Sequence, residues 1–135
     1  MNKPREFSSL EISQMTGATK RQLQWWDERN MIRPMHAIGG IGGTGNPRLY
    51  SPLQALQVYV IIELKSRGVT LPRALDVALR AKLEPRFGQC HYMLVPDDDG
   101  APVVVDKNSI VSTISESPRA WFLVDLEPYI KAVTA

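Results

Sequence analysis

The N-terminal part of the chain arranges its apolar and polar residues with the period of two short helices. Ser8 can cap the first helix, because Glu11 stands three residues on and the two side chains form a capping box. Gly17 is expected to end this helix, since glycine readily adopts the left-handed conformation found just after a helix. Thr19 and Gln22 repeat the capping box directly afterwards. Two capped helices with so short a turn between them predict a helix-turn-helix.

The predicted second helix, residues 19–29, has an apolar and a polar face. Leu23 and Trp26 are three residues apart, so they share the face that would close the core. The opposite face carries basic, amide and aromatic side chains, which suit phosphates and base edges. A solvated amphipathic helix would show a similar surface, so the pattern alone leaves both interpretations open. The outward residues are Lys20, Arg21, Gln24 and Glu28, with Trp25 at the edge of the apolar face.

A third helix is predicted between Ser51 and Gly68, because Ser51 and Gln54 form another capping box and glycine again ends the helix. Its broad apolar surface implies burial on two sides, against the helix-turn-helix and against a later segment or a partner. Thr70 is expected to cap a fourth helix over residues 71–83. The apolar positions are Leu53, Leu56, Tyr59, Val60, Ile61 and Leu64 on the third helix and Leu71, Leu75, Ala78 and Leu79 on the fourth.

The C-terminal part of the chain changes to the pattern of strands. A polar turn at residues 96–100 predicts a hairpin between the first two strands. Asn108 or Ser109 can cap a short helix, and an amphipathic helix closes the chain. Three strands with helices on one face need a further surface to cover them, either the third helix or a second chain. The strand candidates are residues 92–95, 102–105 and 121–124.

A series of short motifs runs through the N-terminal part of the chain, at residues 17–19, 23–28, 31–34, 48–51 and 64–71. In their order and spacing the chain resembles the MerR family of winged-helix transcription regulators, over residues 6–82. The aromatic pair Trp25 and Trp26 fits this family. The chain departs from it at Gln24, where members usually carry Arg, and at Asn30, where they usually carry Gly. Asn also tolerates the left-handed conformation after a helix.

The resemblance over residues 6–82 and the strand pattern of the C-terminal part together predict an α+β fold in two parts. Residues 1–84 would form a winged helix-turn-helix of four helices, with a small β wing between strands near 32–35 and 47–50. Members usually continue into a long antiparallel coiled coil, but residues 85–135 contain no heptad pattern. This segment is therefore expected to form a small α/β unit in the order strand, strand, helix, strand, helix.

Double-stranded DNA is the partner that the resemblance implies, with helix 19–29 in the major groove and the wing and the fourth helix on the flanking backbone. The DNA-binding candidates are Thr19, Lys20, Arg21, Gln22, Gln24, Trp25, Arg48, Tyr50, Arg67 and Arg73. Because such helices usually work in symmetric pairs, a homodimer made by residues 90–135 is expected. The alternative is a monomer whose C-terminal segment folds back onto Tyr59 and Ile61. The expected dimerisation residues are Leu126, Tyr129, Ile130 and Val133.

The glycine-rich segment at residues 40–45 matches GxGxxG, which can bind a dinucleotide. That fingerprint needs a buried strand before it and a helix beginning within it. No apolar strand precedes the segment and Pro47 follows it, so a wing tip is the favoured interpretation. A nucleotide-dependent enzyme built on this loop remains the alternative from another functional class.

Charge divides the chain in the same way as its patterns do. Residues 1–89 carry 13 Lys and Arg against 7 Asp and Glu, a net charge of +6, whereas residues 90–135 carry 3 against 7, a net charge of −4. A basic head with an acidic tail is typical of a nucleic-acid-binding domain joined to a segment with another role. No apolar run approaches the length of a membrane helix, and no apolar signal core begins the chain. A cytoplasmic, nucleoid-associated protein of bacterial or phage type is expected.

Few residues suggest bound metal or catalysis. Cys90, His91 and His36 lack the number and spacing of a zinc site, and the acidic turn lacks the pattern of an EF-hand. No cofactor, metal or enzymatic activity is expected. The predicted function is a sequence-specific transcriptional regulator, with a protein partner or an effector possible at the C-terminal segment. A protein-interaction adaptor and an architectural, excisionase-like DNA-binding protein are the alternatives.

Overall fold

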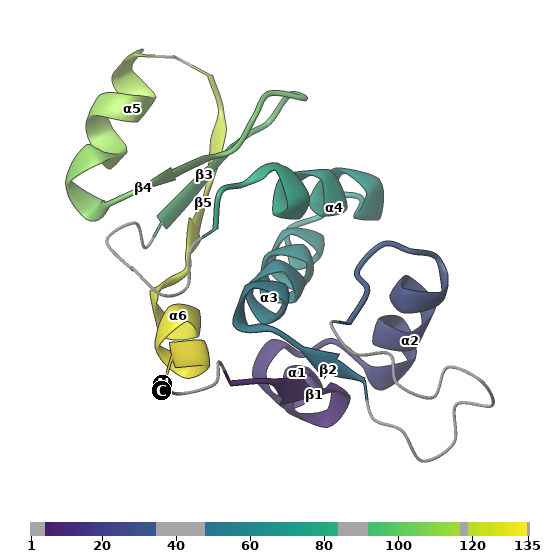
Figure 1. The fold of residues 1–135 in the computed structure, drawn as a ribbon. Helices are drawn as coiled ribbons and strands as arrows, with labels where there is room; N and C mark the ends of the chain where they lie inside the picture. Colours follow the sequence, from purple (N-terminus) through teal and green to yellow (C-terminus); the bar gives the residue numbers. More distant parts are fainter. Residues whose placement is uncertain (1–4, 35–47, 84–91, 117–118, 135) are drawn as a thin grey trace.

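The computed structural model describes residues 5–34, 48–83, 92–116 and 119–134 (Figure 1). The helix-turn-helix is formed by α1 (Ser9–Thr16) and α2 (Lys20–Glu28). Both predicted capping boxes are present, with each cap hydroxyl accepting the amide three residues on at 3.2 and 3.0 Å. Gly17 and Asn30 have φ values of 83° and 58°, so both adopt the left-handed conformation expected of them. The chain is α+β, as predicted.

The short sheet of the head differs from the expectation. β2 (Leu49–Tyr50) pairs antiparallel with β1 (Phe7–Ser8), and residues 32–34 form no strand. The Arg33 carbonyl accepts a hydrogen bond from the side-chain amide of Gln54 instead of a strand partner. The remaining part of the expected wing, residues 35–47 with the glycine-rich segment, lies outside the described residues.

The third and fourth helices pack on each other as α3 (Pro52–Ser66) and α4 (Leu71–Arg80). α4 ends earlier than expected, because Ala81 is extended and Leu83 is buried beyond the helix end. Its buried face is also rotated from the expected one: it consists of Ala74, Val77 and Ala78, while Leu79 is exposed. Small side chains on this face let a helix approach its neighbour closely. Thr70 stands at the N-cap but makes no side-chain cap hydrogen bond.

The C-terminal segment has the predicted order of elements. Asp106, rather than Asn108 or Ser109, caps its first helical turn, because its carboxylate accepts the Ser109 amide at 2.9 Å and a 3-10 turn precedes the helix proper. The strands form one antiparallel sheet in the order β4-β3-β5. The elements are β3 (Tyr92–Pro96), β4 (Val103–Val105), η1 (Lys107–Ser109), α5 (Ile110–Glu116), β5 (Trp121–Asp125) and α6 (Glu127–Thr134).

One continuous core joins the two parts of the chain. α3 contacts α1 and α4 within the head and α6 of the C-terminal segment, so its predicted burial on two sides is confirmed (Figure 1). One face of the sheet contributes Met93, Val95 and Val124 to the same core. The Tyr59 and Tyr129 rings stack at 3.9 Å between centroids, which ties α6 to α3.

The side chains that were expected to form the dimer contact are buried within the chain and belong to its continuous core. The C-terminal segment thus folds back onto α3, which is the alternative arrangement considered above, and an intermolecular contact would have to use other residues. The buried stripe consists of Leu126, Tyr129, Ile130 and Val133.

Candidate nucleic-acid interface

α2 presents its polar face to solvent at one end of the head (Figure 1). Trp26 is 2% exposed and Trp25 is 39% exposed, so the first ring lies in the core and the second at the edge of the solvent-facing surface. Lys20 and Arg21 are exposed in the first turn, where the helix dipole adds positive potential. Neither makes a hydrogen bond or ion pair with any residue that the structure describes. Both cations are therefore free to bind phosphate.

Other candidate side chains of this helix already make contacts within the chain. The Arg29 guanidinium lies 4.3 Å from the centre of the Trp25 ring, which holds that ring against the helix end. The Gln24 amide donates to the Glu28 carboxylate at 2.9 Å. A base edge would have to compete with Glu28 for this amide. Thr19 and Gln22 use their polar groups in the capping box, so these two candidates mainly position the helix.

Asp27 organises two arginines beside α2. One carboxylate oxygen accepts from Arg48 Nε at 2.7 Å, and the other lies 3.5 Å from Arg33 Nε. Asp27 itself is buried, whereas Arg33 and Arg48 keep part of their guanidinium surface exposed. The arrangement holds Arg33 and Arg48, which stand before and after the glycine-rich segment in the sequence, beside the same carboxylate. The sequence analysis missed Asp27 and Arg33, although an acid directly after the buried Trp26 is a signal that a basic partner is needed.

Tyr50 is fully buried, and burial raises the pKa of its phenol. It pairs with Phe7 across the small sheet. Its position supports β2 from within and leaves no surface for a contact with DNA.

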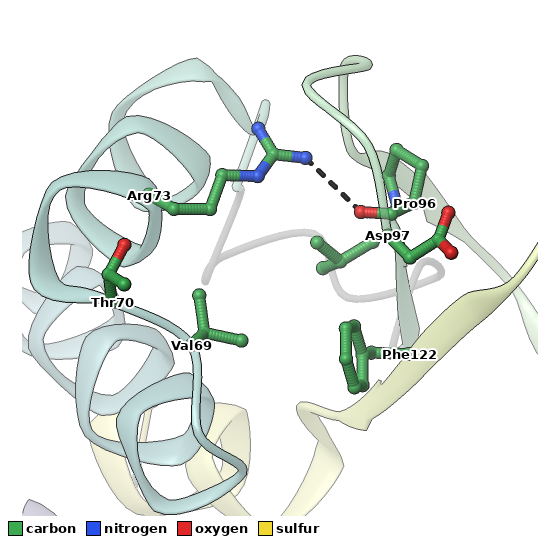
Figure 2. A pocket seen from close by; sticks show the side chains of 7 residues that line it. Val69, Thr70, Arg73, Pro96, Asp97 and Phe122 are labelled. Carbon is green, nitrogen blue, oxygen red and sulfur yellow. Dashed lines mark hydrogen bonds between the residues drawn. The ribbon is translucent and has the colours of Figure 1, made fainter.

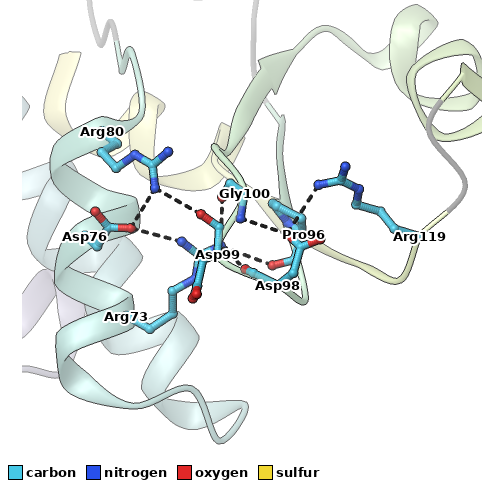
Figure 3. Close-up of polar contacts among 8 residues, drawn as sticks. All are labelled: Arg73, Asp76, Arg80, Pro96, Asp98, Asp99, Gly100 and Arg119. Carbon is cyan, nitrogen blue, oxygen red and sulfur yellow. Dashed lines mark hydrogen bonds and ion pairs between the residues drawn. The ribbon is translucent and has the colours of Figure 1, made fainter.

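Arg67 and Arg73 face the C-terminal segment of the same chain. Arg67 donates to the Leu123 carbonyl of β5 at 2.6 Å. The Arg73 side chain is only 17% exposed. It contacts the Asp76 carboxylate at 3.0 Å and donates to the carbonyls of Pro96, Asp98 and Gly100 at 3.2, 2.6 and 2.9 Å (Figure 3). Arg73 therefore fastens α4 to the turn between β3 and β4.

Two more arginines contact the turn between β3 and β4. Arg80 contacts Asp76 at 3.0 Å and donates to the Asp99 carbonyl at 3.2 Å, and Arg119 contacts Asp98 at 3.2 Å (Figure 3). The pKa of Asp76 is lowered, first by its hydrogen bond from Arg80. The acidic turn is thus used as a partner for the arginines of α4.

A cavity of about 290 Å³ lies between α4 and the sheet (Figure 2). Val69, Val95 and Phe122 give it apolar walls, while Thr70 and Arg73 add polar groups from the head. The Arg73 guanidinium points toward the Pro96 carbonyl at its edge (Figure 2). Its size is near the lower limit of small-molecule sites, which span about 300–1,000 Å³.

Among the described residues, no three or more His, Cys, Asp and Glu side chains are grouped so that they could hold a metal ion. His36, Cys90 and His91 lie outside those residues. None of the described helices is long and apolar enough to cross a membrane.

Comparison with known proteins finds one family. The model of the family described as "MerR HTH family regulatory protein" matches residues 7–79, more than half of the chain. The match begins at β1 and ends in the last turn of α4. It therefore contains the helix-turn-helix and excludes the sheet of the C-terminal segment. No curated protein matches the chain.

Proposed function

Because the chain belongs to the MerR HTH family of regulatory proteins and is thus a DNA-binding transcription regulator, we propose that it recognises a specific operator by inserting α2 into the major groove. The observation that carries the proposal is the exposed face of α2. Lys20 and Arg21 are exposed in its first turn without an intrachain partner among the described residues, while Leu23 and Trp26 are buried.

In this proposal, different residues have different tasks at the DNA. Lys20 and Arg21 neutralise phosphates or reach base edges, and Trp25 provides apolar contact beside them. Arg33 and Arg48, oriented by Asp27, bind the backbone next to the glycine-rich segment. Arg67 and Arg73 leave the set of proposed DNA contacts, since both hold the C-terminal segment.

In this proposal residues 1–84 form the DNA-binding unit and residues 85–135 form a segment with a second role. The shared core on α3 supports the view that the two parts fold as one cooperative unit. The protein would bind as a homodimer, one α2 to each half-site, in the cytoplasm at a bacterial or phage nucleoid. Such a regulator needs no enzymatic activity.

The cavity beside Arg73 supports the proposed effector site at the C-terminal segment. Its walls come from both parts of the chain, so a ligand there would contact the head and the sheet together. Thermal shift with a library of small, mostly apolar fragments tests this role. A stabilising fragment should lose its effect in Val69→Asp, and the effector site is rejected if no fragment raises Tm.

The experiment for the main proposal is selection of bound sequences from random duplex DNA, followed by titration at several salt concentrations. Arg21→Ala should weaken binding by about tenfold or more and reduce the slope of log K against log salt by roughly 0.9 if one phosphate contact is lost. Lys131→Ala is the matched control, because Lys131 is exposed on α6. No enriched sequence would contradict operator recognition, and equal effects of both variants would contradict the role of α2.

A further inference from the structure

Gln24 stands in the middle of the exposed face of α2. Lys20 and Arg21 lie four and three residues before it and Glu28 lies four residues after it, so all three are its neighbours on the helix surface. All four side chains are exposed. A helix that enters the major groove presents its exposed face to the base edges, while cations beside that face hold phosphates. Gln24 is therefore placed to contact a base.

A hydrogen bond determines which way the Gln24 amide is turned. Gln24 Nε2 donates to a carboxylate oxygen of Glu28 at 2.9 Å. An ionised carboxylate can only accept, so the nitrogen of the amide, and not its oxygen, must face Glu28. The amide nitrogen carries two hydrogens. One N–H and the oxygen Oε1 thus remain without a partner among the described residues, and a base edge competes with Glu28 for only one of the two hydrogens.

Contact with DNA would strengthen the bond between Gln24 and Glu28. In water, an exposed pair of this spacing on a helix surface stabilises only weakly. When α2 enters the groove, water leaves the Glu28 carboxylate, which then needs a donor because an unpaired charge is costly to desolvate. Gln24 is the donor that the described residues supply. The amide is therefore held with one donor and one acceptor available to the DNA.

Adenine is the base whose major-groove edge matches one donor and one acceptor. It offers the N6 amino group as a donor and N7 as an acceptor, whereas guanine offers two acceptors, cytosine a donor and thymine an acceptor. A glutamine without a neighbour could rotate its amide to suit other edges. Glu28 opposes that rotation, because its carboxylate would then face Oε1 with no hydrogen between the two oxygens.

We infer that Gln24 reads an adenine in the major groove and that Glu28 is the positioning residue for its amide. The inference rests on the proposed function, because it requires α2 in the groove. It goes beyond that function by naming the base that is read. It also assigns a role to an acidic residue on a surface that faces the phosphates.

Selection of bound sequences from random duplex DNA tests the base. Wild-type protein should enrich a site with adenine at one base pair, where any other base weakens binding by about tenfold. Gln24→Arg should enrich guanine at that base pair and leave the other positions unchanged, because arginine binds guanine O6 and N7 together. Gln14→Arg is the matched control, since it adds the same charge at an exposed glutamine of α1 and should keep adenine.

Two results of this selection overturn the inference. One is a site that is identical for wild-type protein and Gln24→Arg. The other is a site in which the base that changes is not adenine. Both leave operator recognition by α2 intact and refute only the adenine contact. A wild-type protein that enriches no sequence refutes the proposed function and this inference together.

Glu28→Ala tests the positioning role. The freed Gln24 amide should accept other edges, so the preference for adenine at that base pair should fall by about three- to tenfold. The affinity for other sequences should not fall, because the variant removes a negative charge near the phosphates. Glu116→Ala, which removes the same charge from the end of α5, is the control. An unchanged preference for adenine, or an equal loss of affinity for every sequence with a lower Tm, excludes the positioning role.

Discussion

Arg21 and Arg73 are both arginines of the head, and their surroundings give them different roles. Arg21 is exposed on α2 and has no hydrogen-bond or ion-pair partner among the described residues. Arg73 is largely covered and donates to three backbone carbonyls and one carboxylate. Residue type and spacing do not distinguish the two. The distinction comes from the turn at residues 96–100, which reaches Arg73 from a distant part of the chain.

Arg73→Ala should lower the free energy of unfolding by about 1–3 kcal/mol, because three backbone carbonyls and one carboxylate would lose a charged donor. Urea unfolding of the full chain measures this. Lys82→Ala is the control, since Lys82 is exposed just beyond α4. If Arg73 contacts DNA instead, its substitution should weaken binding without changing stability.

Glu11 makes part of the stability depend on pH. Its pKa is lowered, first by the hydrogen bond from the Ser8 amide and further by Arg5. The unfolded chain therefore holds the proton more tightly, so this contribution is complete above the ordinary value of 4.5 and is lost as pH falls through the lower folded pKa. Glu11→Gln keeps an acceptor for the cap and should flatten the loss of stability in acid. Unfolding curves between neutral pH and acid check this, and an unchanged acid limb contradicts it.

At the scale of the element, α2 combines a buried and an exposed face within one short helix. The adjacent residues Trp25 and Trp26 provide a matched pair for testing this. Trp26→Ala should destabilise the protein by about 3–5 kcal/mol, because it empties a large buried site. Trp25→Ala should have a much smaller effect on stability but weaken DNA binding. Thermal unfolding and DNA titration of both variants measure the two effects, and the opposite pattern would mean that the faces of α2 are reversed.

At the scale of the whole molecule, the C-terminal segment completes the core of the head. α3 is buried on one side by α1 and on the other by α6, with Tyr59 stacked on Tyr129. The buried Tyr129 hydroxyl has no hydrogen-bond partner among the described residues, and burial raises its pKa. Its ring, rather than its hydroxyl, holds α6 in place.

Truncation after Leu83 should therefore produce a head that unfolds at lower temperature and aggregates, because the apolar side of α3 that faces α6 becomes exposed. Circular dichroism during heating, with light scattering for aggregation, measures the result. Removing only α6 by truncation after Asp125 is the matched comparison and should cause much of the same loss. A head that melts like the full chain would show that the two parts fold independently.

Local signals in the sequence determined the helices and their ends. The capping boxes of Ser8, Thr19 and Ser51 and the left-handed positions Gly17 and Asn30 depend on residues a few positions apart, so they could be predicted without knowing the fold. The inward side of α2 and the order of elements in the C-terminal segment followed from periodicity in the same way.

Long-range contacts decided what those elements do. The pairing of β2 with β1, the rotated face of α4, the burial of the α6 stripe on α3 and the use of Arg67 and Arg73 all join residues far apart in the chain. An amphipathic stripe has the same sequence whether it covers its own chain or a second copy. Only the tertiary structure selects between these, because burial depends on which apolar surfaces are close enough to exclude water together.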